Sequence, residues 1–342
     1  GLNTGVTLYS GGKLNKTIKQ KQIENSAYSY DIEQSALDIE ISVVQAYLQI
    51  LYANESLEIA KKAVALSQTQ VERGLQMYQA GSISKADLAQ LQSQNAGDKH
   101  QLTQAKNSLS SAKLTLKQLL ELELEDEFDV VFTEFDDQQV LKIIPDLYSV
   151  YQAALNNLPQ MKSSALSVES ANMAISVAKA SMLPTISASA SINTGTISSA
   201  GASYFEQLGN KINENIGLNL SIPIFNNKQI RTNINKAELQ SESAQLQDLS
   251  LKKQLLSTIE SLHNDAVSAQ SQYVSAKEQL DAAKASFELV NEQFLAGLKN
   301  TIEMITEQNN YTNALSTLLQ SRFQAVSCLM LLELYQYQNM NF

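Results

Sequence analysis

Apolar and small side chains recur at alternating spacings of four and three residues along much of the chain. The pattern runs through residues 32–71 and 269–294, and it returns in residues 88–116 and 304–332. A repeat that averages about 3.5 residues predicts helices that supercoil and pack side by side. The expected seam positions are Ile32, Ala36, Ile39, Val43, Ala46, Ile50, Ala53, Leu57, Ala60, Val64, Ser67 and Val71, then Leu88, Asn95, Leu102, Ala105, Leu109, Ala112 and Leu116, and later Ala269, Tyr273, Ala276, Leu280, Ala283, Phe287, Val290 and Phe294, with Met304, Tyr311, Leu318, Ala325, Cys328 and Leu332.

Helix breakers are absent from long stretches, which sets the expected helix lengths. Neither Gly nor Pro occurs from Lys13 to Arg73 or from Lys228 to Ala296. We predict long helices over residues 13–78 and 228–296, the first of them roughly 100 Å long at the usual rise per residue. Return helices are expected over 84–120 and 301–336, after tip turns at 79–83 and 297–300. Gly81 and Gly297 are expected to stop the first helix of each pair in a left-handed conformation.

Strand patterns occupy the rest of the chain. Residues 2–9 predict a strand, residues 159–182 a helix, and residues 184–225 a strand hairpin whose long outer loop covers 193–215. Ile216, Leu218 and Leu220 share one face of this hairpin, with Gly217 and Asn219 on the other. This alternation suits a membrane barrel strand, apolar toward lipid and polar toward the lumen, and equally a soluble hairpin with one buried face. The linker at 121–158 holds an acidic stretch, residues 121–129, and a short strand candidate, residues 128–132.

The sequence repeats itself at an offset of 216 residues. "LNTGVTLYSGGKLNKTI" (2–18) aligns with "LNLSIPIFNNKQIRTNI" (218–234), and the same offset places Tyr78 on Phe294 and Gly81 on Gly297. A fixed period of this kind indicates tandem structural units. We therefore divide the chain into repeat one (1–120), the linker (121–158) and repeat two (159–342).

Composition agrees with long helices and excludes several functions. The 342 residues include only 12 Gly and 4 Pro, and the formal net charge is −10. Nucleic-acid partners are disfavoured, because phosphate binding requires clustered Lys and Arg. The single cysteine, Cys328, and the widely separated His100 and His263 favour neither a catalytic site nor a metal or other cofactor. No stretch is apolar enough for a transmembrane helix, and no secretory signal is recognised at Gly1.

"LYSGGKLNKT" (8–17) resembles a phosphate-binding loop at first sight. That loop requires a glycine five residues before its Gly-Lys pair and Ser or Thr directly after the lysine. Thr7 and Leu14 occupy those positions, and the repeat-mate "IFNNKQIRTN" contains no glycine. The stretch is better interpreted as a corner between strand and helix. Its candidate residues are Tyr9, Gly11 and Gly12 in repeat one, and Phe225, Asn226 and Asn227 in repeat two.

These motifs together resemble the TolC-like outer-membrane efflux family. "SIPIFNNKQI" is similar to the family's strand-to-helix corner, "SMLPTISASA" to its helix-to-strand entry, and "MYQAGSISKADL" and "QFLAGLKNTIEM" to its helix tips. The resemblance implies a homotrimer with one β-barrel in outer-membrane lipid and one α-helical tunnel in the periplasm. It also implies a further helix and strand before Leu2, and hence an N-terminally truncated chain.

The resemblance further implies an exit duct for drugs, small molecules or proteins, working with an inner-membrane pump and a periplasmic adaptor (membrane fusion) protein. It places adaptor docking at Tyr78, Gly81, Ser84, Phe294, Gly297 and Lys299. The family's pore acid, six places after the second tip glycine, corresponds to Glu303, while Thr306 stands where a second acid is common. Asp87 and Glu307 are further pore candidates, and for Glu303 an ordinary acid at a helix start remains the alternative. A soluble periplasmic adaptor or structural coiled coil is the alternative function, and an enzyme is least favoured.

Overall fold

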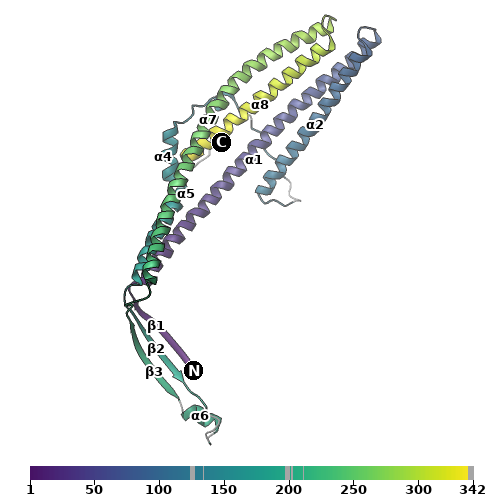
Figure 1. Ribbon diagram of the computed structural model, residues 1–342. Coiled ribbons are helices and arrows are strands. Elements are labelled where there is room, and N and C mark those ends of the chain that lie inside the picture. The colour runs from purple at the N-terminus through teal and green to yellow at the C-terminus, as the bar shows by residue number, and fades with distance from the viewer. Residues whose placement is uncertain (124–127, 134, 197–200, 202, 211, 338–342) are drawn as a thin grey trace. The chain divides into compact units, whose positions relative to one another are not determined.

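The computed structural model describes residues 1–123, 128–133, 135–196, 201, 203–210 and 212–337 (Figure 1). Its elements are β1 (Leu2–Ser10), α1 (Lys13–Gln79), α2 (Lys85–Leu119), α3 (Asp137–Val140), α4 (Leu147–Asn157), α5 (Pro159–Ala180), β2 (Thr185–Asn193), α6 (Tyr204–Asn210), β3 (Asn213–Ser221), α7 (Gln229–Leu295) and α8 (Thr301–Tyr337). The predicted class, mainly α with a few strands, is confirmed.

The helix bounds follow the offset found in the sequence. Helices α1 and α7 have 67 residues each, and adding 216 to the bounds of α1 gives the bounds of α7. The same shift carries Lys85, the first residue of α2, onto Thr301, the first residue of α8. Equal helix lengths on equivalent positions are expected when two copies of one unit share the same start and stop signals.

The chain separates into two compact units. Unit 1 comprises Gly1–Gln34 and Leu158–Gln254, and unit 2 comprises Ser35–Asn157 and Leu255–Phe342. The units divide the molecule in space, whereas the two repeats divide it by sequence. Each repeat contributes to both units, because α1 and α7 each begin in unit 1 and end in unit 2.

Unit 1 holds an antiparallel sheet in the order β1-β2-β3, with the strands side by side in Figure 1. Ala188 pairs with Val6 on one side and with Leu218 on the other, so apolar side chains from all three strands gather on one face. Ser189 pairs with Gly5 and Gly217 on the opposite face, which is small and polar. The predicted alternation is therefore observed. The apolar face is uncovered by the described residues, since Ile216 is 87% and Leu218 73% exposed.

Hydroxyl groups attach α5 to both of its helical neighbours in unit 1. Ser163 Oγ donates to Asp31 Oδ1 of α1 at 2.5 Å, and Ser164 Oγ donates to Asp248 Oδ1 of α7 at 2.8 Å. Consecutive serines point to different sides of a helix, so one short stretch of α5 can serve two partners. Small residues on α5 thus allow three helices to pack closely.

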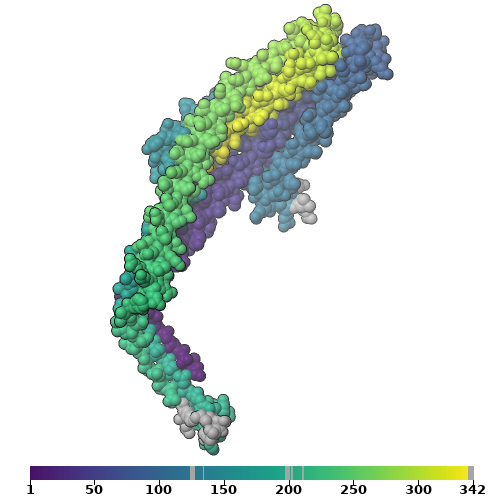
Figure 2. Space-filling view, viewed as in Figure 1, coloured from purple at the N-terminus to yellow at the C-terminus, as the bar shows by residue number. Residues whose placement is uncertain are grey.

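Unit 2 contains two antiparallel helical hairpins. In one hairpin, Ile50 and Ala53 of α1 pack on Ala112 and Leu116 of α2. In the other, the rings of Phe287 on α7 and Tyr311 on α8 stack at 5.7 Å between centroids. Figure 2 shows α7 and the yellow end of the chain in continuous contact along this second hairpin. The predicted seam positions are buried or half-buried from Val43 onward.

Three expectations from the sequence are wrong. Ile32, Ala36 and Ile39 are exposed rather than in a seam, because α2 ends at Leu119, where its last buried residue, Leu116, already packs beside Ile50. The strand expected at residues 128–132 is absent from that described segment, whose Phe128 and Val130 instead pack on the α1–α2 seam.

The third correction concerns the outer hairpin. Strand β3 ends at Ser221, before Pro223, which cannot donate a ladder hydrogen bond. The expected loop at 193–215 contains β2's last residue, the short helix α6 and the start of β3. Residues 197–200, 202 and 211 of that loop, and residues 124–127 of the acidic stretch, lie outside the described part of the chain.

Candidate functional site

The strand-to-helix corners are built from left-handed residues. Gly11 and Gly12 have φ of 62° and 74° between β1 and α1, and Asn227 and Lys228 have φ of 50° and 63° before α7. The offset of 216 residues relates the two pairs. Asn226, named from the sequence, is not among the left-handed residues, and its carbonyl oxygen accepts from Gln229 N at 2.9 Å. Lys228 was missed, although the alignment with Gly12 could have identified it.

Gly11 fills a position that no larger residue fits. A Cβ there would lie 2.6 Å from Leu183 Cβ and 2.8 Å from Ala180 O, whereas one at Gly12 would meet nothing within 4 Å. The end of α5 therefore packs directly on the first corner. Tyr9 and Phe225, the aromatic residues of the two corners, are exposed.

We expect Gly11→Ala to lower the free energy of unfolding by more than about 2 kcal/mol, because a left-handed alanine costs roughly 1–2 kcal/mol before any clash is counted. Gly12→Ala carries the backbone cost alone and should have the smaller effect. Gly97→Ala, in open space on α2, should stabilise the chain by about 0.5–1 kcal/mol. Chemical unfolding of the three variants checks this order; equal effects at Gly11 and Gly12 would show that the contact with Leu183 is unimportant.

The tip between α1 and α2 consists of a motif that ends α1 and a cap that begins α2. Gly81, at φ 76°, donates to Tyr78 O at 3.0 Å, and Ser82 N donates to Met77 O at 2.8 Å, which ends α1 in a Schellman motif. Ser84 then caps α2: its Oγ accepts from Asp87 N at 3.1 Å, while Asp87 Oδ2 accepts from Ser84 N at 3.1 Å. This reciprocal pair is a capping box.

The tip between α7 and α8 repeats the same construction. Gly297, at φ 74°, donates to Phe294 O at 3.0 Å, and Leu298 N donates to Gln293 O at 2.8 Å. Asn300 Oδ1 accepts from Glu303 N at 2.9 Å, and Glu303 Oε2 accepts from Asn300 N at 3.2 Å. Glu303 therefore occupies the same capping position in repeat two that Asp87 occupies in repeat one.

The two tips line one groove of about 660 Å³ in unit 2, which we call the tip groove. It brings together seven residues named from the sequence, namely Gly81, Ser84, Asp87, Phe294, Gly297, Lys299 and Glu303. The remaining lining residues are Met77, Ser82, Ile83, Leu298, Asn300 and Thr301. Residues more than 200 positions apart in the chain thus form a single surface.

The charges of the tip groove are held in fixed places. Lys299 Nζ donates to Glu303 Oε1 at 2.7 Å, and this bond, together with the backbone bond from Asn300, lowers the pKa of the Glu303 carboxyl below its usual range. The pKa of Asp87 is lowered in the same direction, chiefly by the side-chain hydrogen bond from Ser84, whose Oγ lies 2.6 Å from Oδ2. Both carboxylates are therefore ionised at neutral pH.

Of the candidates named from the sequence, Tyr78, Thr306 and Glu307 do not line the tip groove, and Phe294 lines it from its buried side. Thr306 is exposed and donates to Ile302 O of its own helix at 2.8 Å, while Glu307 accepts from Ser286 Oγ of α7 at 2.8 Å. Tyr78 is partly exposed outside the groove. Phe294, only 3% exposed, packs with Leu91 and Met304 beneath the tips, so it supports the surface from within.

Sequence reasoning missed the residues that shape the groove between the charges. Leu298 is 76% exposed beside the second tip glycine, and Asn300 supplies the cap that positions Glu303. The signal for Asn300 was available, because an N-x-x-E sequence before an apolar run is a capping box pattern. Nothing in the linear pattern showed that Met77 and Ile83 would face repeat two.

No part of the described chain gathers three or more His, Cys, Asp or Glu side chains in a way that could hold a metal ion. Among the described helices, none carries an apolar stretch that is long enough and sufficiently free of charge to cross a membrane. Cys328 is buried in α8, and burial raises the pKa of its thiol.

Solved structures share this fold at low sequence identity. The Campylobacter jejuni CmeC outer membrane channel is 19% identical, with a TM-score of 0.78 over 98% of this chain and 70% of that chain. The Vibrio cholerae outer membrane protein VceC is 16% identical, with a TM-score of 0.77 over 98% and 77%. A structure of CusC, described as forming a transmembrane channel, is 17% identical, with a TM-score of 0.81 over 98% and 76%.

The sequence of the chain also matches the model of a protein family. No curated protein matches the chain significantly, but the model of outer membrane efflux proteins matches residues 1–121 and 150–333, well over half of the chain. The repeated tips and corners described above lie within the matched residues. The chain therefore belongs to the outer membrane efflux protein family, whose members resemble TolC.

Proposed function

We propose that three copies of this chain form an exit duct across the outer membrane, through which drugs, other small molecules or proteins leave the cell without chemical change. The strands contribute to a barrel in lipid, and the helices to a tunnel in the periplasm. A periplasmic adaptor docks at the tip groove and connects the duct to an inner-membrane pump. Family membership supports the role of an outer membrane channel, and the properties of unit 1 and the tips support the remaining steps.

The sheet has the surface that a lipid-facing element requires. Its apolar face has an exposed residue on each of the three strands, namely Val6, Ile192 and Leu218, and its other face carries Ser, Thr, Asn and Gly. A soluble hairpin would bury the apolar face, and none of the described residues covers it. Strands β1 and β3 are the sheet's edges, so pairing between neighbouring copies would satisfy their backbone groups, as lipid demands.

The single observation that carries the proposal is the joining of the two tips in one groove. Two repeat-related turns, each with a Schellman motif and a capping box, present exposed apolar and charged side chains at the end of paired helical hairpins. Fixed turns of this kind reduce the entropy lost on docking. The tip groove therefore suits contact with the helical end of a partner.

The oligomeric state of the complete protein tests the proposal. Light scattering of the protein extracted from membranes should give a detergent-bound trimer. A monodisperse monomer that needs no detergent would contradict the duct and would favour the soluble periplasmic adaptor instead.

For the pore, we expect Glu303→Gln to reduce cation selectivity in planar bilayers, because three symmetry-related carboxylates near a constriction attract cations. Glutamine keeps the capping bond to Asn300, so the change removes charge with little effect on the turn. Since the pKa of Glu303 is lowered, the wild-type selectivity should persist at neutral pH and decline only in acid, below the ordinary carboxyl range. Glu292→Gln, at an exposed carboxylate of α7 outside the tip groove, is the matched control and should leave selectivity unchanged. Unchanged selectivity in Glu303→Gln would remove Glu303 from the pore.

A further inference from the structure

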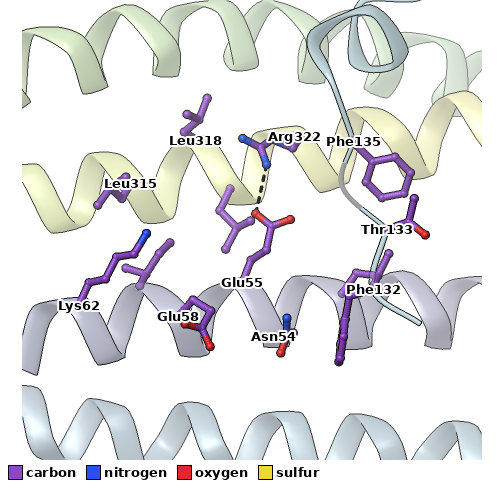
Figure 3. Close-up of a pocket in the computed structure, with 13 residues that line it drawn as sticks. Asn54, Glu55, Glu58, Lys62, Phe132, Thr133, Phe135, Leu315, Leu318 and Arg322 are labelled. Atoms are coloured by element: carbon purple, nitrogen blue, oxygen red, sulfur yellow. Dashed lines mark hydrogen bonds and ion pairs between the residues drawn. The ribbon is translucent and has the colours of Figure 1, made fainter. Parts of the chain in front are cut away.

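A second hollow lies in the middle of unit 2, far along the hairpins from the tip groove. It has a volume of about 550 Å³ and is lined by α1, by α8 and by Phe132, Thr133 and Phe135. Figure 3 shows these three residues at one end and Lys62 of α1 at the other. Leu315 and Leu318 of α8 line the wall between them. We call this hollow the linker pocket.

The apolar walls of the linker pocket are only half covered. Ile59, Leu315 and Leu318 are intermediate in exposure, and Phe132 is exposed. The end opposite Lys62 is held in place, since the Phe135 ring packs edge-on against Phe323 at 5.8 Å between centroids, and Phe323 belongs to the core. Pockets of this size that combine apolar walls with a few fixed polar groups are typical of small-molecule sites.

One charged residue that lines the linker pocket has no ion-pair partner in the described chain. Glu55 is paired with Arg322, whose Nη1 lies 3.1 Å from Oε2, and Glu58 is paired with Lys61 at 2.7 Å. Lys62 has no hydrogen-bond or ion-pair partner within the described chain. The charged residues that line the pocket are Glu55, Glu58, Lys62 and Arg322, and among them Lys62 alone has no partner in the described chain. Its ammonium is therefore the group that a ligand's charge would meet.

We propose that the linker pocket binds an amphipathic organic monoanion, with a carboxylate or sulfonate at Lys62 and an aliphatic or aromatic body that extends along Leu315 and Leu318 toward Phe132 and Phe135. The anion supplies the partner that Lys62 lacks. The apolar body covers side chains that the chain leaves half-exposed, and it gains from their removal from water. A neutral molecule of the same shape gains only from the burial of apolar surface, and a cation is repelled by Lys62.

The test uses the complete protein in lipid nanodiscs, with 2-naphthoate as the anionic probe and 2-naphthamide as its neutral analogue. Ligand-observed NMR, corrected with empty nanodiscs, gives both dissociation constants. Naphthoate should bind more tightly than naphthamide, and the difference should shrink as salt is added. Lys62→Gln should weaken naphthoate by about threefold to fivefold, the upper end for an ion pair at an exposed position, and leave naphthamide unchanged.

Further variants separate the linker pocket from general surface binding. Phe132→Ala should weaken both probes, and Glu58→Gln should strengthen naphthoate, because it removes a like charge from the wall. Lys106→Gln, at an exposed lysine of α2 outside the linker pocket, is the matched control and should change neither constant. Equal binding of the two probes, or an unchanged naphthoate constant in Lys62→Gln, would overturn the proposal. So would the absence of binding in the assembled protein, since a neighbouring copy would then cover the linker pocket.

Discussion

Met304→Ala is expected to lower the free energy of unfolding by about 2–5 kcal/mol, the usual cost of truncating a fully buried methionine to alanine. Met304 is completely buried between the two hairpins, where it packs with Leu91 of α2 and Phe294 of α7. Its Sδ also accepts from Gln70 Nε2 of α1 at 3.0 Å, so the truncation leaves a buried amide without that partner. One side chain therefore joins four helices below the tip groove.

Hydrogen exchange is the suitable measurement for Met304→Ala, because it locates the loss as well as its size. Amide protection should fall most in the helix ends that carry the two tips. Ile302→Ala, two positions earlier on the exposed side of α8, is the control and should change stability by less than about 0.5 kcal/mol. Similar losses in both variants would show that the cluster around Met304 does not hold the tips together.

Leu298→Asp is expected to abolish export while leaving the trimer intact. Leu298 is highly exposed, lines the tip groove and makes its backbone bond through N–H, so a new side chain there does not disturb the turn. An aspartate places an unpaired charge at the centre of a docking contact, where desolvation of that charge opposes binding. Adaptor pull-down should fall at least about tenfold, which corresponds to roughly 1.4 kcal/mol.

Leu298→Met is the matched control, because methionine keeps the apolar surface and nearly the same volume. It should retain both adaptor binding and export of a fluorescent dye from cells. If Leu298→Asp exports normally and still captures the adaptor, the tip groove is not the docking surface. If both variants lose the trimer, Leu298 contributes to assembly instead.

Much of the helical architecture was predictable, because local signals determine it. Long stretches without Gly or Pro predicted the two long helices, and Gly81 and Gly297 marked where they stop, although α1 continues through Gly74. The alternation of β3 predicted its two faces correctly, since successive side chains on a strand must point to opposite sides.

Features that depend on contacts between distant residues were not predictable in the same way. Ile32 and Ile39 keep the seam period, yet they are exposed, because burial depends on where the partner helix ends. The tip groove and the linker pocket join α8 to residues of α1 that lie more than 200 positions earlier. At residues 128–132, apolar content suggested a strand, but the described segment has no neighbouring strand with which to pair.

The most direct test of the account is single-channel recording on the complete protein reconstituted in planar lipid bilayers. An outer membrane exit duct predicts discrete conductance steps from the trimeric fraction, and these steps should pass cations in preference to anions. A folded, correctly assembled preparation that leaves the bilayer at its background conductance would contradict the account.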